Sequence, residues 1–132
     1  MMIWLNRHYQ ILARILAWIG LLAIVVLSVI PATERPITNF GSQWEHFIAF
    51  GSVAAVFAIG YELSLARLLL FAFFFCAGIE LLQAPLPTRH ARVSDFLIDF
   101  TVSCFALGLV RITQKLIAPK RTAAPMKGAS TK

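Results

Sequence analysis

Charged side chains are scarce in this chain of 132 residues: 14% of the positions are Asp, Glu, Lys or Arg, and only six of these are acidic. Average soluble domains contain about 25% charged and about 45–50% apolar residues. Here 59% of the chain is hydrophobic. This composition excludes an ordinary water-soluble domain and favours a lipid bilayer as the solvent.

Cysteine is also scarce. The two cysteines, Cys76 and Cys104, both lie within apolar segments and have no second Cys or His close by in the sequence. That spacing does not fit a disulfide framework or a zinc site. We interpret both as small hydrophobic residues, and the sequence predicts no cofactor and no metal site built on cysteine.

The shortage of acidic residues leaves a net charge of +6 and a pI of about 10.0. A high pI often indicates nucleic-acid binding. In this chain, however, Lys and Arg gather at the ends of apolar segments and in a short C-terminal tail, which is the usual pattern of a membrane protein. The predicted partners are therefore membrane lipids, with no nucleic acid.

Four apolar segments approach the roughly 20 residues that a helix needs to cross a bilayer. They cover about 11–30, 46–63, 65–82 and 96–117. They predict an all-α bundle of four transmembrane helices within 11–117, preceded by the short segment 1–10. The first segment resembles a signal peptide, but a small-x-small cleavage pattern is absent around "SVIPATERP", so we expect it to be retained.

The remaining segments and the connections complete the predicted domain layout. Only "YELS" separates the second and third spans, which predicts a tight antiparallel hairpin. The tail 118–132 has no apolar periodicity and is predicted to be a disordered, basic extension. Small residues at four-residue spacing in the second span, such as Gly51 with Ala55 and Ala54 with Ala58, favour close helix packing in lipid. We therefore expect the second helix to be central.

The distribution of Lys and Arg predicts the orientation of the bundle. In this topology 3 of the 12 basic residues fall on one side and 9 on the other. The side with three holds Arg35, Arg89 and Arg92. The side with nine holds Arg7, Arg14, Arg67, Arg111, Lys115, Lys120, Arg121, Lys127 and Lys132. Because cytoplasmic segments are the richer in Lys and Arg, both termini are predicted to be cytoplasmic.

Polar residues are concentrated at the predicted outer ends of the last three spans. Glu80 and Gln83 are three residues apart, and Asp95 and Asp99 are four apart, so each pair shares one helix face. The full set is Glu45, His46, Glu80, Gln83, Arg89, His90, Arg92, Asp95 and Asp99. Ionisable residues inside a membrane are candidates for function. We predict catalytic roles for His46, Glu80 and Asp95, and ligand-binding roles for Gln83, Arg89, Arg92 and Asp99.

These residues resemble motifs of the VanZ-like family of small bacterial membrane proteins. The resemblance spans roughly 31–110. Its motifs are His46-Phe47 opening a helix, Glu80-x-x-Gln83 closing the next helix, and Pro87-x-Arg89 followed by Asp95 and Asp99. Two departures are Ser42-Gln43, where many members have Asp-Lys, and Asp99, where many have Asn. The resemblance implies a multi-pass protein of the bacterial inner membrane. It also implies a role in the cell envelope, in a family named for glycopeptide resistance.

Three functions are compatible with this pattern. The favoured one is binding or modification of an anionic envelope lipid or lipid-linked precursor at the outer face. In this function Arg89 and Arg92 hold a phosphate, Glu80 or Asp95 orients or deprotonates the attacking group, and His46 shuttles a proton. The Lys-x6-Arg-Pro and Ser-Gly-His signatures of lipid phosphatases are absent, which disfavours hydrolysis through a phosphohistidine. Whether the chain is an enzyme stays open.

The two alternatives use the same polar residues differently. In one, the chain is a non-enzymatic scaffold or accessory subunit whose charge network holds its helices together. In the other, which is less favoured, carboxylates bind a divalent metal or line an ion path. The residues of that site would be Glu45, His46, Glu80, Asp95 and Asp99.

Overall fold

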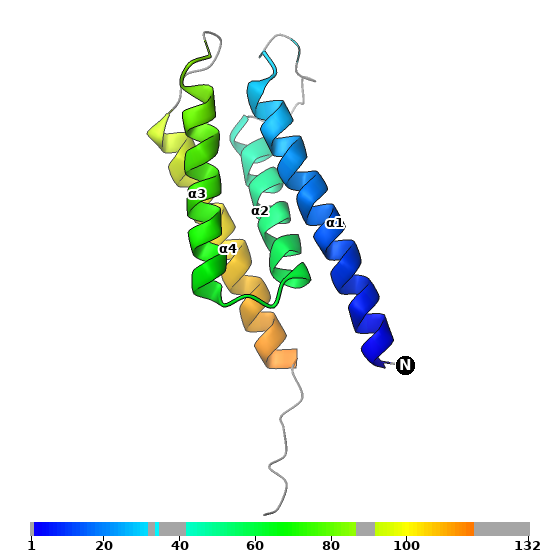
Figure 1. Cartoon of the computed structure of the whole chain (residues 1–132). Helices are drawn as coiled ribbons and strands as arrows, with labels where there is room; N and C mark the ends of the chain where they lie inside the picture. Colours follow the sequence, from blue (N-terminus) through cyan, green and yellow to red (C-terminus); the bar gives the residue numbers. More distant parts are fainter. Residues whose placement is uncertain (1, 32–33, 35–41, 87–91, 118–132) are drawn as a thin grey trace, which may run out of the picture.

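The computed structural model describes residues 2–31, 34, 42–86 and 92–117. These residues form four helices, α1 (Met2–Val29), α2 (Ser42–Gly60), α3 (Leu65–Gln83) and α4 (Val93–Ile117), and contain no strand (Figure 1). The predicted all-α bundle of four helices is therefore confirmed for this part of the chain. Helix α1 begins at Met2, well before the predicted span at 11. The predicted disordered tail at 118–132 lies outside the described residues.

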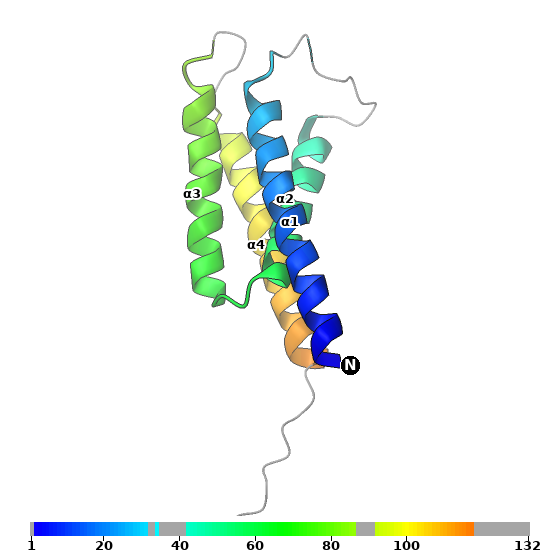
Figure 2. The ribbon, with the colours of Figure 1, turned by 45° about the vertical axis from the view of Figure 1, so that its right-hand side comes forward.

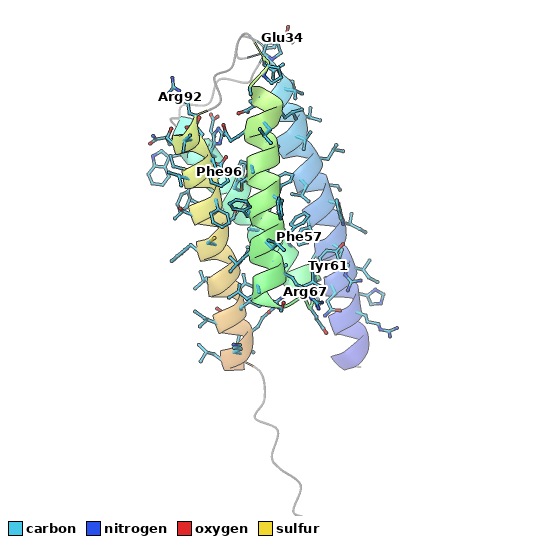
Figure 3. All side chains as sticks on the ribbon, turned by 60° about the vertical axis from the view of Figure 1, so that its left-hand side comes forward. Glu34, Phe57, Tyr61, Arg67, Arg92 and Phe96 are labelled. Carbon is cyan, nitrogen blue, oxygen red and sulfur yellow. The ribbon has the colours of Figure 1, made fainter. Side chains whose placement is uncertain are left out.

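The helices run alternately up and down, so the start of α1 and the end of α4 lie at the same end of the bundle (Figure 1). We call this the basic end, defined by Arg7, Arg14, Arg67, Arg111 and Lys115. We call the opposite end the acidic end, defined by Glu45, Glu80, Asp95 and Asp99. Figure 3 shows Glu34 and Arg92 at the acidic end and Tyr61 and Arg67 at the basic end. The membrane side that each end faces stays a prediction.

Three of the helices are long and apolar enough to cross a membrane, over Arg7–Val29, Leu65–Gln83 and Val93–Ile117. These helices are compatible with a multi-pass membrane protein. Helix α2 has 19 residues, as many as α3. It falls outside this group because its first turns carry Gln43, Glu45 and His46. Its passage through the membrane is still a prediction.

Helix α2 is central, as its small residues predicted, and its two main packing partners are α1 and α4. Ala17 of α1 and Ala58 of α2 are completely buried. On the other side of α2, the space for a side chain at Gly51 is limited by Val102 of α4. Small side chains allow these helix backbones to approach closely.

The predicted hairpin of α2 and α3 has the expected short connection and antiparallel direction, but the two helix backbones do not pack closely against each other. The connection between them is short, and Ser64 caps α3 by accepting a hydrogen bond from the Arg67 amide at 3.4 Å. Helix α3, however, packs mainly on α4, and α2 and α3 do not lie directly side by side (Figure 2). Large rings fill the space between them, including Phe57 and Phe71, whose centroids are 4.8 Å apart. Side chains and not backbone atoms therefore make the contact between the two helices.

The backbones of α1 and α2 approach closely at Gly60, where a Cβ atom would lie 3.0 Å from the backbone nitrogen of Arg14. Backbone atoms cannot move aside as a flexible side chain can. We expect Gly60→Ala to lower the free energy of unfolding by about 1–3 kcal/mol. The matched control is Gly108→Ala in α4, where a Cβ meets nothing within 4 Å. That control is expected to be neutral or to stabilise by up to about 1 kcal/mol. Equal thermal melting of the two variants in detergent would contradict the close contact.

Candidate functional site

The acidic end is organised around a contact between a histidine of α2 and a carboxyl group of α4. The Nδ1 atom of His46 lies 3.1 Å from Oδ1 and 3.2 Å from Oδ2 of Asp99. The Asp99 side chain is 2% exposed and that of His46 is 20% exposed. When Asp99 is ionised its carboxylate only accepts hydrogen bonds, and Nδ1 is then the donor in this contact. Two residues that are 53 positions apart thus join the first turns of α2 to those of α4.

The surroundings of this pair fix the orientation of both side chains. The His46 ring stacks on Phe50, with centroids 6.0 Å apart and an interplanar angle of 6°. One turn deeper in α4, the Ser103 hydroxyl donates to the Asp99 backbone oxygen at 2.8 Å. The buried Cys76 of α3 lies beside Asp99 and Ser103. The Asp99 carboxylate is therefore enclosed by three helices.

Glu80 of α3 interacts with the start of α4. Its Oε2 atom accepts a hydrogen bond of 3.1 Å from the Arg92 backbone amide, immediately before the first residue of the helix. The first amides of a helix have no partner within the helix, and a negative charge is favourable there. Glu80 also lies within electrostatic range of His46, Asp95 and Asp99. One predicted catalytic residue thus caps a neighbouring helix.

Gln83 of α3 is buried, with 5% of its surface exposed, and its contact is with α1. Its Nε2 atom donates to the Ser28 backbone oxygen at 3.4 Å. Ser28 is buried as well, and its hydroxyl donates to the Ile24 oxygen at 2.7 Å. The predicted ligand-binding residue Gln83 therefore joins two helices. The sequence interpretation overlooked Ser28, although it continues the buried stripe of Ala17, Leu21 and Ile24 at helical spacing.

The other predicted site residues differ in how the structure places them. Asp95 is partly exposed and accepts a hydrogen bond of 3.3 Å from Ser94 Oγ. Arg92 is exposed, and within the described part of the chain its guanidinium has no ion pair. Arg89 and His90 lie outside the described residues. The prediction that Arg89 holds a phosphate or a carboxylate is therefore still a prediction.

A metal site at the acidic end would need several ligands close together. In the described part of the chain, no three His, Cys, Asp or Glu side chains are close enough together to hold a metal ion. The pair of His46 and Asp99 offers one nitrogen and one carboxylate, which is short of the roughly six or more oxygen ligands that Mg²⁺ or Ca²⁺ prefers. The described geometry gives the metal hypothesis no support.

The chemistry of the His46–Asp99 pair is that of an oriented imidazole. A carboxylate that holds one ring nitrogen fixes the tautomer and stabilises the protonated form. The opposite nitrogen, Nε2, is then the atom at which the ring accepts or donates a proton. The predicted proton-shuttle role of His46 is compatible with this arrangement. The sequence did not identify Asp99 as its partner.

The sequence interpretation also missed a polar cluster at the basic end. The Nη2 atom of Arg111 donates to the backbone oxygens of Tyr61 and Leu63, both at 2.7 Å. Arg14 Nε donates to the Gly60 oxygen at 2.8 Å, and its guanidinium lies 5.0 Å from the centre of the Tyr61 ring. Two arginines from α1 and α4 thus hold the end of α2 and the turn after it.

Two further side chains complete this cluster. Trp18 Nε1 donates to the Tyr61 hydroxyl at 2.8 Å. Gln10 Nε2 donates to Glu62 Oε1 at 2.7 Å. The hydrogen bond to Glu62 thus joins α1 to the turn between α2 and α3.

Comparisons of this chain with protein-family models, with curated proteins and with solved structures find no match.

Proposed function

We propose that this chain is a VanZ-like multi-pass protein of the bacterial inner membrane. In this proposal it binds or modifies an anionic envelope lipid or lipid-linked precursor at its acidic end, which faces outward. The observation that carries the proposal is the His46–Asp99 pair, in which a buried carboxylate orients an imidazole at the acidic end of the bundle. The resemblance adds support because the residues of its motifs that are described gather at this same end.

In this proposal, the role of each residue follows from the exposure of its side chain and from its contacts. Arg92 is exposed at the start of α4 and is available to hold a phosphate, with Arg89 three residues before it in the sequence. His46 is partly exposed, and in this proposal its Nε2 atom hydrogen-bonds the headgroup and carries the proton. Asp99 is buried and positions His46. Glu80 and Gln83 hold α4 and α1 in place, so we assign them to positioning and no longer to catalysis or ligand binding.

The proposal is tested with His46→Asn, because the Asn amide nitrogen takes the place of Nδ1 and keeps a donor toward Asp99 while Nε2 is removed. The measurement is the amount of a photoreactive anionic lipid that crosslinks to the acidic end, within 42–50 and 92–99. We expect crosslinking of the anionic lipid to the wild type and a loss of about tenfold in His46→Asn, the effect of one charged hydrogen bond. Arg92→Gln is expected to give a similar loss.

Ser94→Ala is the matched control, because Ser94 is exposed at the same end and contacts only Asp95 in the described chain. It is expected to retain the crosslinking. Unchanged crosslinking in His46→Asn and Arg92→Gln, with normal melting temperatures, would exclude a headgroup site at the acidic end.

A second candidate function is a non-enzymatic scaffold, favoured by the contact of Glu80 with the Arg92 amide. That contact, like the one between Gln83 and Ser28, joins helices and needs no ligand. In a scaffold, lipid crosslinking and melting temperature fall together in every variant of the acidic end. In the favoured function, His46→Asn separates them, because the lipid is lost while the fold stays stable.

A further inference from the structure

The basic end carries three cations that the fold does not use. The side chains of Arg7, Arg67 and Lys115 are exposed, and within the described chain they make no hydrogen bond and no ion pair. Arg14 and Arg111 differ from them, because their guanidinium groups bind backbone oxygens of the turn between α2 and α3. The five cations of this end thus fall into two structural groups.

Acidic counter-charges are nearly absent here. Among the described residues Glu62 is the only acid at the basic end, and Gln10 holds its carboxylate at 2.7 Å. The other described acids belong to the opposite end of the bundle, where Figure 3 shows Glu34. The neutralising charge for Arg7, Arg67 and Lys115 must therefore come from outside the described fold.

The spacing of these cations along their helices is comparable to the thickness of a layer of lipid headgroups. Arg67 lies in the first turn of α3, next to the turn that Arg14 and Arg111 hold. Lys115 lies four residues beyond Arg111, about 6 Å further along α4, and Arg7 lies about 10 Å beyond Arg14 along α1. The headgroup region of one leaflet is about 5–8 Å thick. Three helices can thus place a cation within or beside one such layer.

From charge, exposure and spacing together, we infer that Arg7, Arg67 and Lys115 form a surface that selects anionic phospholipids in the leaflet at the basic end. The lipid phosphates neutralise these cations, while Arg14 and Arg111 hold the turn. This surface is separate from the proposed headgroup site at the acidic end and does not depend on it. It acts by charge and not by a shaped pocket.

The test uses the full chain in detergent with an equimolar mixture of phosphatidylglycerol and phosphatidylcholine that have the same acyl chains. Native mass spectrometry gives the ratio of the two lipids bound. We expect the wild type to prefer phosphatidylglycerol and each neutralised cation to reduce the preference about fivefold. The variant R7Q/R67Q/K115Q is expected to lose about a hundredfold. High ionic strength should also erase the preference, because the Debye length falls to about 3 Å at 1 M salt.

Two controls distinguish a charged lipid surface at the basic end from a loss of folding and from an effect of the acidic end. The triple variant removes no side-chain hydrogen bond of the described fold, so it should melt as the wild type does. His46→Asn and Arg92→Gln at the acidic end should leave the loss caused by the triple substitution unchanged, which keeps the two proposals independent. A triple variant with the wild-type lipid ratio would overturn the inference. The inference would also be overturned if an acidic soluble protein bound through these cations while the chain bound the two lipids equally.

Discussion

Asp99→Ala is expected to lower the free energy of unfolding by about 3–5 kcal/mol, the range for removing one partner of a buried ion pair. The substitution leaves the His46 Nδ1 donor without its acceptor and opens space between α2, α3 and α4. Asp95→Ala is the matched control, because Asp95 lies one turn earlier on the same face and is partly exposed. The control is expected to lower the free energy of unfolding by about 0.5 kcal/mol or less. Unfolding in mixed detergent micelles measures both values.

A double-variant cycle separates the interaction energy between His46 and Asp99 from the effect of the cavity that Asp99→Ala leaves. If His46 and Asp99 interact directly, His46→Ala combined with Asp99→Ala should cost less than the two separate losses together, with a coupling of about 0.5–3 kcal/mol. Strict additivity would mean that the contact at 3.1 Å contributes nothing to stability.

Arg111→Met is the second substitution with a large expected effect, a loss of about 2–4 kcal/mol in the free energy of unfolding. Met retains much of the length and the apolar part of the Arg side chain. The loss in free energy of unfolding therefore measures the contribution of the guanidinium group. Its Nη2 atom joins α4 to the oxygens of Tyr61 and Leu63. Hydrogen bonds to charged groups contribute about 1.5–3 kcal/mol each. Thermal melting in detergent is the measurement.

The controls for Arg111 use the same helix. Arg111→Lys should restore part of the stability, because an ammonium group reaches the carbonyls as a point charge but lacks the planar fork. Lys115→Met, one turn further along α4, should change the free energy of unfolding by less than about 0.5 kcal/mol. Equal losses at Arg111 and Lys115 would show that charge at the membrane surface, and not the bond to the turn, is responsible.

Much of the architecture could be predicted because helix length and side-chain size are local properties. Apolar segments of membrane length predicted the four helices. The small residues of α2, such as Gly51 and Ala58, predicted its central position because close packing requires them. The gathering of His46, Glu80, Gln83, Asp95 and Asp99 at one end followed from alternating helix direction alone.

The contacts of the site were less predictable because many partners are backbone atoms. Glu80 binds an amide, Gln83 binds the oxygen of Ser28, and Arg111 binds two oxygens of the turn. Any sequence presents such groups, so no motif marks them. The position of α3 was missed for a related reason: a short connection fixes where α3 begins but not which helix it packs against.

The central claim, that the acidic end binds an anionic headgroup, is tested most directly by mapping where such a headgroup lies. The measurement is photo-crosslinking with an anionic phospholipid that carries the reactive group on its headgroup, followed by identification of the modified residues. It is best done on R7Q/R67Q/K115Q, in which labelling at the basic end is suppressed. We predict adducts within 42–50 and 92–99, reduced by unlabelled anionic lipid and by His46→Asn. Adducts confined to the exposed apolar faces, with none at the acidic end, would contradict the claim.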